Sequence, residues 1–440
     1  MQEINIQDFL NKELVNYASY DNLRKIGSCI DGLKNASRKV MFTIHEKKIR
    51  EKVKVSQLSA KCAEYSDYLH GDTLWNVLVT LGKDYAGTNN IPLIKKFGNF
   101  GTRCINESSA PRYIFAKGSD EFFKYFMYED DSILEQQYFE GNRIEPRFYV
   151  PTLPFLLVNG SEGVSSGFAQ KILPRYPENL KMYILNSING KDNDDSLLYP
   201  WVKGFEGDFY KDPEVEGRWY FTGKVEHIQH YEYLITEVPF TYDLKSYTKV
   251  LEDLEDSGVI NKFQNVSDGE NKIQFKVWIP KGVDTSNEAL LDRLKLIKVM
   301  TENYTCIDEN NKIIEFSTAR QIIDHYIEVK LEYLQKRKDF ILTSFENDLK
   351  WLSFKIKFLT LFIENKINIV KVPIVQIVKQ LEDFGFEKYE DSYNYLLSMP
   401  ISSLTMEKLD SLNKEYSNLS DKKSKLEKTS IAQLWKNDLK

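Results

Sequence analysis

The spacing of apolar residues changes along the chain, and it is most regular in the last third. Two sets of apolar residues recur there at steps of four and three: Phe345, Leu349, Leu352, Ile356, Leu359 and Ile363, then Leu409, Leu412, Tyr416, Leu419 and Leu426. Such spacing places apolar side chains on one stripe of a helix, as in a coiled coil. It predicts a long antiparallel helix pair, with a small helical tip around residues 394–404, where Pro400 interrupts the pattern.

A shorter helical pattern lies within residues 56–85. A first helical segment is followed by a turn, and the second segment carries apolar residues at helical spacing, at Leu74, Val77, Leu78 and Leu81. This predicts a helix-turn-helix, whose second helix can enter a DNA groove while the first spans the backbone. Many helix pairs with this spacing only pack a core, so the pattern alone does not establish DNA binding.

An irregular loop is predicted for residues 91–116. Gly98, Gly101 and Pro111 interrupt regular structure there, and three basic residues lie among them, Lys95, Lys96 and Arg103. Such a loop suits the presentation of a side chain to a ligand, although an ordinary turn has the same composition.

Short β-prone runs dominate the middle of the chain, at residues 147–164, 218–225, 231–240 and 271–280, with a helical segment at 247–258. Strands are predicted to stop near Ser317. The chain is therefore predicted to be an α+β multidomain protein. Its expected parts are an amino-terminal arm (1–22), a helix-turn-helix domain (23–150), a mixed α/β domain (151–316) and a coiled-coil domain (317–440).

The composition predicts a globular protein of the cytoplasm with no membrane partner. Of 440 residues, 42% are hydrophobic and 28% are charged, and no apolar run approaches the roughly 18 residues of a membrane helix. The first residues carry acids where a signal peptide needs basic and then apolar residues. The cysteines are widely spaced single residues, which predicts reduced structural thiols and no metal site in this chain: Cys29, Cys62, Cys104 and Cys306.

The net charge of −6 argues weakly against nucleic-acid binding, but the charge is unevenly distributed. From Leu23 to Lys54 there are ten lysines and arginines against three acids, a local excess of seven positive charges. That excess favours a face that binds DNA phosphates, and a solvated helix surface is the alternative.

Six short segments carry a family resemblance through their order. They are NLRKIGSCIDGLKNASRKVMF (22–42), YLHGD (68–72), GNFGTR (98–103), SAPRYIF (109–115), VNGSEGVSSGFAQKILP (158–174) and YLLSMPISSLTMEKLDSL (395–412). In this order they resemble the cleavage subunit of type II DNA topoisomerases, of the gyrase A and topoisomerase IV A kind, over nearly the whole chain. Asn35, Leu69 and Val164 depart from the family, in which proline, a second histidine and isoleucine are usual.

The resemblance implies four catalytic residues. Tyr113 would attack a DNA phosphodiester and form a transient 5′-phosphotyrosyl double-strand break, through which another duplex passes. Because a phenol is mostly protonated near neutral pH, its neighbours must assist the attack. Arg112 and Arg24 would stabilise the negative charge of the transition state. His70 would either hold the scissile phosphate or move a proton, and both roles stay open.

The resemblance also implies residues that bind DNA and the overall architecture. Lys34, Arg38 and Lys39 would hold backbone phosphates, and Asn99 would contact DNA from its loop. Val164 would insert as a wedge between base pairs, with a buried valine as the alternative. The implied architecture is a winged-helix domain, an α/β tower and an antiparallel coiled coil, whose small helical tip is an exit gate (C-gate) that joins two copies.

The cofactors are expected to be bound by another chain. The sequence has no G-x-x-x-x-G-K-[ST] loop, and its D-x-D string at 192–194 lies in a polar stretch without the context of a metal-binding module. The resemblance implies that a separate ATPase/Toprim large subunit binds ATP and supplies most of the Mg²⁺. A chain that begins near the winged helix and stops after the coiled coil most resembles the medium subunit of the T-even-type bacteriophage enzymes, which favours relaxation over supercoiling.

Two other classes of protein remain as alternatives. A non-catalytic architectural protein would bind duplex DNA and dimerise through the coiled coil, but would not need the Arg112–Tyr113 pair. A tyrosine recombinase would carry its nucleophile near the carboxy-terminus, whereas Tyr113 lies early in the chain.

Overall fold

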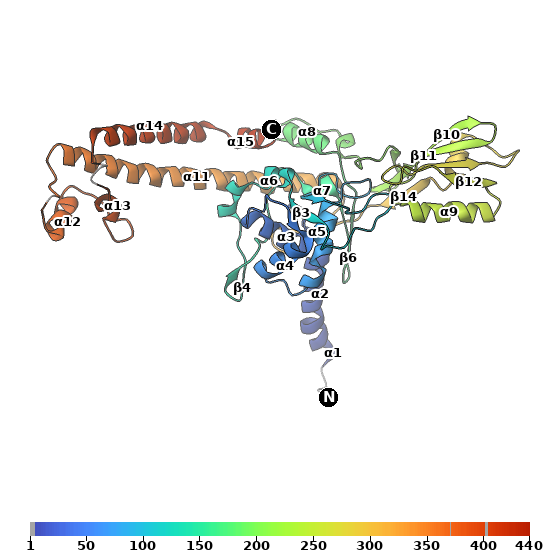
Figure 1. Cartoon of the computed structure of the whole chain (residues 1–440), viewed down its shortest axis with the longest axis horizontal. Coiled ribbons are helices and arrows are strands. Elements are labelled where there is room, and N and C mark those ends of the chain that lie inside the picture. The colour runs from blue at the N-terminus through green and yellow to red at the C-terminus, as the bar shows by residue number, and fades with distance from the viewer. Residues whose placement is uncertain (1–4, 370, 401–403) are drawn as a thin grey trace. The chain divides into compact units, whose positions relative to one another are not determined.

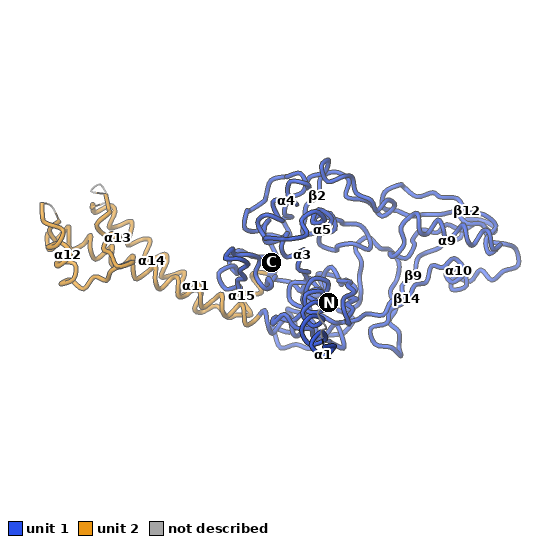
Figure 2. Tube along the Cα trace, turned by 90° about the horizontal axis from the view of Figure 1, so that it is seen from below, with its two compact units in different colours: residues 1–330, 439 blue, residues 331–438, 440 orange. Residues whose placement is uncertain are grey.

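The computed structural model describes residues 5–369, 371–400 and 404–440 (Figure 1). Two compact units divide between Lys330 and Leu331 (Figure 2). The boundaries at residues 22, 150 and 316 that the sequence indicates stay predictions. No helix in the described ranges is long and apolar enough to cross a membrane. All four cysteines are buried and free of disulfides.

Helical segments begin the first unit: α1 (Ile6–Asp8), the π-helical η1 (Phe9–Leu14) and α2 (Val15–Lys25). Asp21 and Lys25 form an ion pair of 2.9 Å on the last turn of α2. Ile26 then adopts an extended backbone and is buried. The predicted amino-terminal arm is therefore helical from Ile6 onward, and its residues 1–4 lie outside the described part.

A group of helices on a small sheet follows. The helices are α3 (Asn35–Glu46), α4 (Val55–Tyr65), η2 (Gly71–Thr73) and α5 (Leu74–Gly82). The sheet has the order β1 (Val53–Lys54), β3 (Phe115–Gly118), β2 (Ile94–Phe97), and both pairings are antiparallel. Leu58, Leu74 and Leu78 are fully buried between the helices. The predicted helix, turn and second helix within residues 56–85 are thus confirmed as elements.

The chain then passes through α6 (Asp120–Tyr125), the 3-10 helix η3 (Tyr128–Ile133) and a short hairpin of β4 (Tyr138–Phe139) and β5 (Asn142–Arg143). Ser119 starts α6, because its hydroxyl oxygen accepts a hydrogen bond of 3.0 Å from the Phe122 N–H. His45, near the end of α3, packs 4.1 Å from the Tyr128 ring, measured between centroids. Aromatic contacts therefore join this segment to α3.

One predicted β run is a helix in the structure. Within residues 147–164, the apolar segment forms α7 (Phe155–Asn159), which is buried along most of its length. Pro154 precedes its first residue, and Gly160 ends it with φ of 69°. The prediction was wrong there because a fully buried apolar run has no polar alternation to distinguish a strand from a short helix. A hairpin of β6 (Ser161–Val164) and β7 (Ala169–Ile172) follows.

The mixed α/β region contains two larger sheets. After α8 (Pro177–Ser187) and η4 (Asp195–Leu198), one sheet has the order β14 (Ile297–Thr301), β9 (Arg218–Thr222), β8 (Asp208–Lys211). The other has the order β10 (Lys224–Gln229), β11 (Glu232–Glu237), β13 (Phe275–Trp278), β12 (Lys262–Asn265). Helices α9 (Leu244–Asp256) and α10 (Asn287–Arg293) accompany them, and Tyr247, Leu251 and Phe275 lie in a common buried core. The hairpin of β15 (Tyr304–Ile307) and β16 (Ile313–Phe316) ends the region, so the predicted stop near Ser317 is confirmed for named strands in the described residues.

The long helix α11 (Ala319–Ile363) leads into the second unit, which also holds α12 (Ile374–Asp383), α13 (Asn394–Leu397), α14 (Met406–Lys428) and α15 (Ile431–Asp438). Leu352, Leu359 and Leu412 form a buried seam between α11 and α14. Lys423 pairs with Glu346 at 3.1 Å, and Lys338 donates to the Glu427 carbonyl at 3.0 Å. Residue numbers therefore fall along α11 as they rise along α14, which means that the two helices run antiparallel. The antiparallel pair is confirmed.

A separate apolar cluster lies at the far end of this pair, where α12 and α13 fold against the end of α11. Phe358, Ile377, Leu381 and Leu396 are buried in it. This is the predicted small helical tip. Residues 401–403 of its sequence motif lie outside the described part, and the predicted role of the tip in joining two copies stays a prediction.

Candidate functional site

Tyr113 lies in a turn that is fastened to the start of α4. Its N–H donates to the Ala110 carbonyl at 2.9 Å, while the N–H groups of Ser56 and Val55 donate to the carbonyls of Pro111 and Ile114 at 3.2 and 3.0 Å. The side chain itself is 67% exposed. A large aromatic side chain thus projects from a backbone that hydrogen bonds hold on both sides.

The loop before this turn is ordered by its own backbone bonds. The Asn99 side-chain oxygen accepts from the Gly101 N–H at 2.8 Å, and the Asn99 carbonyl accepts from the Ser109 N–H at 3.0 Å. Gly101 has φ of 91°, and a Cβ there would lie 2.5 Å from the Asn106 carbonyl oxygen. Asn99 is exposed, as its proposed DNA contact requires, but its side-chain oxygen already braces the loop.

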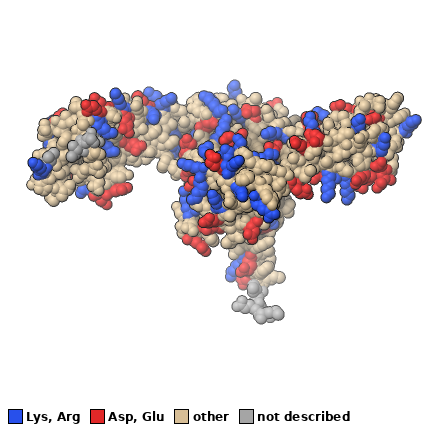
Figure 3. Space-filling view, viewed as in Figure 1, with Lys and Arg blue, Asp and Glu red and all other residues tan. Residues whose placement is uncertain are grey.

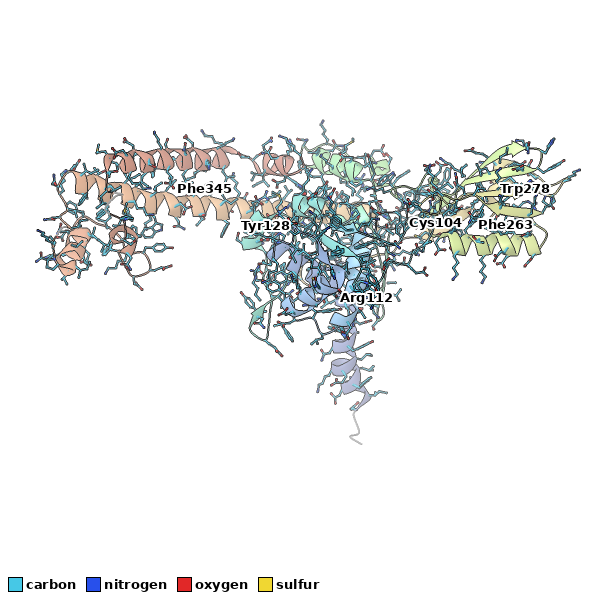
Figure 4. All side chains as sticks on the ribbon, viewed as in Figure 1. Cys104, Arg112, Tyr128, Phe263, Trp278 and Phe345 are labelled. Carbon is cyan, nitrogen blue, oxygen red and sulfur yellow. The ribbon has the colours of Figure 1, made fainter. Side chains whose placement is uncertain are left out.

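Arg112 is an exposed cation next to Tyr113. Its guanidinium carbon lies 5.0 Å from the centre of the Tyr113 ring. It forms no ion pair with any residue that the structure describes, so its donors are available to an anion. Figure 4 shows Arg112 on the outer part of the body formed by the first helices.

The other two predicted catalytic residues lie on separate elements. His70 is exposed in the turn between α4 and α5, with its ring 5.7 Å from that of Tyr68. Arg24 is half-buried on the last turn of α2 and, within the described ranges, has no hydrogen-bond or ion-pair partner. No hydrogen bond or ring contact joins Tyr113 to either residue among the described side chains. Among these four side chains, the described contact is thus the one between the sequence neighbours Arg112 and Tyr113.

Val164 lies at the end of the β6–β7 hairpin, where it pairs with Ala169 and is 72% exposed. The hairpin packs closely on the end of α2, because a Cβ at Gly163 would lie 2.1 Å from the Lys25 carbonyl oxygen. The Lys34 ammonium donates to the Glu162 carbonyl at 2.6 Å. The alternative of a buried valine is therefore wrong, and the exposed side chain sits on a supported hairpin.

Gln170 is a positioning residue that the sequence analysis missed. Its side chain accepts from the Gly27 N–H at 2.9 Å and donates to the Thr305 carbonyl at 2.8 Å. It is buried and joins the β6–β7 hairpin, the segment after α2 and the β15–β16 hairpin. A polar residue at an inward position of β7, next to Ala169 and Lys171, was the signal in the sequence.

Arg38 and Lys39 are buried and paired with carboxylates, and their contact with DNA phosphates stays a prediction. The Arg38 guanidinium donates to both carboxylate oxygens of Asp31, at 2.8 and 2.9 Å. The Lys39 ammonium donates to Glu145 at 2.9 Å and to the Ser66 carbonyl at 2.7 Å. All of these residues are buried, so the two cations stabilise the fold.

Lys34 is an intermediate case. It is half-buried, and its ammonium donates a hydrogen bond to the Glu162 carbonyl of the β6–β7 hairpin. Burial lowers the pKa of this lysine. The structure gives it a bracing role, and its contact with DNA stays a prediction.

Three further cations of the basic run line a hollow of about 860 Å³. They are Lys47, Lys48 and Arg50. Two cations from outside the run, Lys61 and Arg143, also line the hollow. Figure 3 shows lysine and arginine gathered on the body that carries α3 and α4. The predicted basic face is therefore split between buried ion pairs and an exposed cationic surface.

The possible metal ligands of the described residues form two small clusters. Neither of the two clusters of three or more possible ligands in the described part of the chain includes a residue of the loop 98–113. In the polar stretch after α8, Asp194 accepts from the Ser196 N–H at 2.8 Å, and Asp195 pairs with Arg320. These carboxylates serve local structure.

Known proteins similar to this chain are type II topoisomerases. The chain is 33% identical over 455 residues to the mitochondrial DNA topoisomerase 2 of Dictyostelium discoideum, covering 100% of this chain and 35% of that protein. It is 28% identical over 502 residues to DNA topoisomerase 2 of Saccharomyces cerevisiae, again covering 100% of this chain and 35% of the relative. The chain therefore spans about a third of the length of the curated relatives it matches.

A solved structure agrees with the sequence matches. The crystal structure of the Plasmodium falciparum topoisomerase II DNA-binding, cleavage and re-ligation domain superposes with a TM-score of 0.87 at 28% identity, covering 98% of this chain and 63% of that one. The family model for the A subunits of DNA gyrase and topoisomerase IV matches residues 24–440. The chain belongs to this DNA gyrase/topoisomerase IV family of A subunits.

Proposed function

We propose that this chain breaks and rejoins duplex DNA within a type II topoisomerase, with Tyr113 as the nucleophile. The observation that carries the proposal is the geometry of one turn. Tyr113 is exposed on a backbone fastened to α4, and the unpaired Arg112 guanidinium lies beside its ring. An exposed nucleophile next to a free cation is the arrangement that attack on a phosphodiester needs.

In the proposed reaction, the Tyr113 oxygen bonds to phosphorus and the phenol proton is released. The bond between phosphorus and the 3′ oxygen breaks and the 3′ oxygen gains a proton from solvent, which leaves a 3′ hydroxyl and a 5′-phosphotyrosyl ester with no net change in protons. Rejoining is the reverse reaction, so the phosphodiester energy is conserved. Arg112 and Arg24 offset the charge that builds on the phosphoryl oxygens, and His70 either holds the phosphate or moves a proton. Arg24 and His70 would approach Tyr113 only around bound DNA.

The same proposal assigns DNA binding to two further elements. The α4–α5 pair with the β1–β3–β2 sheet would act as a winged helix, with α5 directed at a groove. Val164 would enter between base pairs, because it is exposed at the end of a hairpin that Lys34 and Gln170 support. Asn99 would contact the backbone through its exposed amide.

We further propose a separate large subunit that binds ATP and supplies Mg²⁺, and a dimer of this chain through the α12–α13 tip. This two-subunit arrangement is like that of the T-even-type phage enzymes, whereas the relatives named above are eukaryotic. The test is to ask whether this chain alone, or only with an added ATPase/Toprim protein, relaxes supercoiled DNA. Activity that requires the added protein supports two subunits.

The central test is to mix the chain with a Toprim-containing partner, Mg²⁺ and end-labelled duplex, and to stop the reaction with detergent. Protein attached to 5′ ends is expected for the wild type and lost in Tyr113→Phe. Tyr138→Phe is the matched control, since Tyr138 is 68% exposed and lies outside the motifs.

Adducts that persist in Tyr113→Phe would exclude this nucleophile. No adduct from an assembled wild-type complex that still binds duplex would instead favour the non-catalytic architectural protein.

A further inference from the structure

Two clusters in the described part of the chain place three possible ligand atoms within 4.8 Å of one another. The clusters are His45, Glu46 and Asp131 in one, and Cys29, Glu309 and His325 in the other. The two clusters differ in the ion pairs that their carboxylates already form.

The cluster at the end of α3 lies among charges of both signs. Burial lowers the pKa of His45 to about 4; the hydrogen bond to the Phe126 backbone opposes this shift, and the nearby Arg143, Arg50 and Lys48 add to it. Arg143 also pairs with Glu46 at 2.8 Å. Because Glu46 is already paired with a cation, this cluster is the poorer candidate for a metal ion.

The cluster around Cys29 lies in a negative environment. Burial raises the pKa of the Cys29 thiol well above its usual range, and nearby Cys306, Glu309 and Asp308 raise it further. Arg147 donates to the Glu309 carbonyl, but its guanidinium is paired with Glu135. The carboxylate of this cluster, Glu309, forms an ion pair only with His325 of the same cluster among the described residues.

Three separate elements bring these side chains together. Cys29 follows α2, and its N–H donates to the Ile307 carbonyl at 2.9 Å. Glu309 lies in the turn between β15 and β16, and His325 lies near the start of α11. The Nε2 atom of His325 is 3.1 Å from Oε2 of Glu309, and these side chains are 23% and 33% exposed. Cys29 thus closes the buried side of the cluster, and the other two ligands face solvent.

We propose that Cys29, Glu309 and His325 bind a Zn²⁺ ion, with a water molecule in the fourth position. Thiolate, imidazole and carboxylate are the usual zinc ligands, at roughly 2.0–2.3 Å from the metal. Binding releases the Cys29 thiol proton to solvent and replaces the hydrogen bond between His325 and Glu309 with two metal bonds. One thiolate and one carboxylate balance the charge of the ion.

Such an ion would join the segment that leads to Asp31, the β15–β16 turn and the start of α11. It would therefore stabilise the first unit independently of DNA cleavage. Cys306 is not a ligand in this proposal, because its sulfur donates to the Tyr304 carbonyl and accepts from Gln170.

The test is to strip the full chain with a chelator, titrate it with Co²⁺ and then Zn²⁺, and follow the thiolate-to-cobalt absorption band and bound metal by mass spectrometry. One equivalent per chain and a thiolate band are expected for the wild type. Cys29→Ser should lose the band and the metal, and Glu309→Gln should bind at least about tenfold more weakly. Cys62→Ser is the matched control, because Cys62 is equally buried but belongs to neither cluster.

Wild-type uptake below a tenth of an equivalent, or equal uptake by Cys29→Ser, would overturn the proposal. Circular dichroism of the stripped variants shows whether each is folded. If Cys29→Ser does not fold, the half-exposed Glu309→Gln decides, and unchanged affinity in that variant rejects the site.

Discussion

Helix α3 and the loop 98–113 both carry basic residues that the family resemblance predicts to act on DNA, but these residues differ in burial and in their partners. Arg38 and Lys39 on α3 are buried and paired with carboxylates. Arg112 in the loop is exposed, lies beside the Tyr113 ring and forms no ion pair among the described residues. A motif therefore marks a charged residue as important, while burial shows whether its charge acts on the fold or is available to a ligand.

The largest expected effect is on stability. Arg38→Ala removes the partner of the fully buried Asp31, and breaking one side of a buried ion pair costs about 3–5 kcal/mol. Denaturant unfolding measures the loss. Lys95→Ala is the control, since its exposed pair with Asp120 at 3.5 Å should contribute less than about 1 kcal/mol. If Arg38→Ala left the free energy of unfolding unchanged but weakened DNA binding, Arg38 would act on DNA and not on the fold.

Arg112→Ala should show the opposite behaviour. Its unfolding free energy should change by less than about 0.5 kcal/mol, because the side chain is exposed. Loss of a donor that stabilises the transition state should slow cleavage by about 10²–10³-fold. Rapid-quench measurement of adduct formation by the assembled enzyme tests this. A stability loss that matches the loss of activity would mean that Arg112 is structural.

Asp131, in η3 beside the end of α3, should make the free energy of unfolding depend on pH. Burial and Glu46 raise the pKa of Asp131 to about 7. As pH rises from the unfolded value of 3.8 toward 7, the unfolded chain loses this proton while the folded chain retains it, so stability from this group falls. Above pH 7 the folded carboxylate is charged and the full cost is present.

Asp131→Asn removes that cost. Its stability relative to wild type should rise through this window and level off above pH 7, by roughly 2 kcal/mol after allowing for solvent screening. Urea unfolding of both proteins at pH 5 and pH 8 measures the difference. A variant that is relatively less stable at pH 8 would show that the folded carboxylate is stabilised.

The smallest expected effect is at the hairpin end. Val164→Ala should leave stability unchanged within about 0.5 kcal/mol, because the side chain is exposed. Removal of a wedge should weaken DNA bending and cleavage by about tenfold, since unstacking a base step costs a few kcal/mol. Val299→Ala, in the exposed part of β14, is the matched control. Equal effects of the two substitutions on bending would reject the wedge.

The elements with a periodic pattern could be predicted from the sequence. The α11–α14 pair and the α4–α5 pair follow from apolar spacing, because a helix repeats its buried face every three or four residues. The α7 segment could not be predicted, since a run that is apolar on all sides carries no period. The start at Pro154 and the positive φ of Gly160 decide its conformation.

The candidate site was predictable in part. The motifs located Tyr113, Arg112 and Val164, which the structure leaves exposed. They did not show that Arg38 and Lys39 are buried, because their partners depend on tertiary packing. Lys39 pairs with a residue 106 positions away.

The most direct test of the proposed mechanism is to identify the tyrosine that carries the DNA. Trapped adducts of the assembled enzyme would be digested with nuclease and trypsin, and the peptides analysed by tandem mass spectrometry. A nucleotide is expected on the peptide that runs from Tyr113 to Lys117. A nucleotide on any other tyrosine, with the Tyr113 peptide unmodified, would contradict the mechanism.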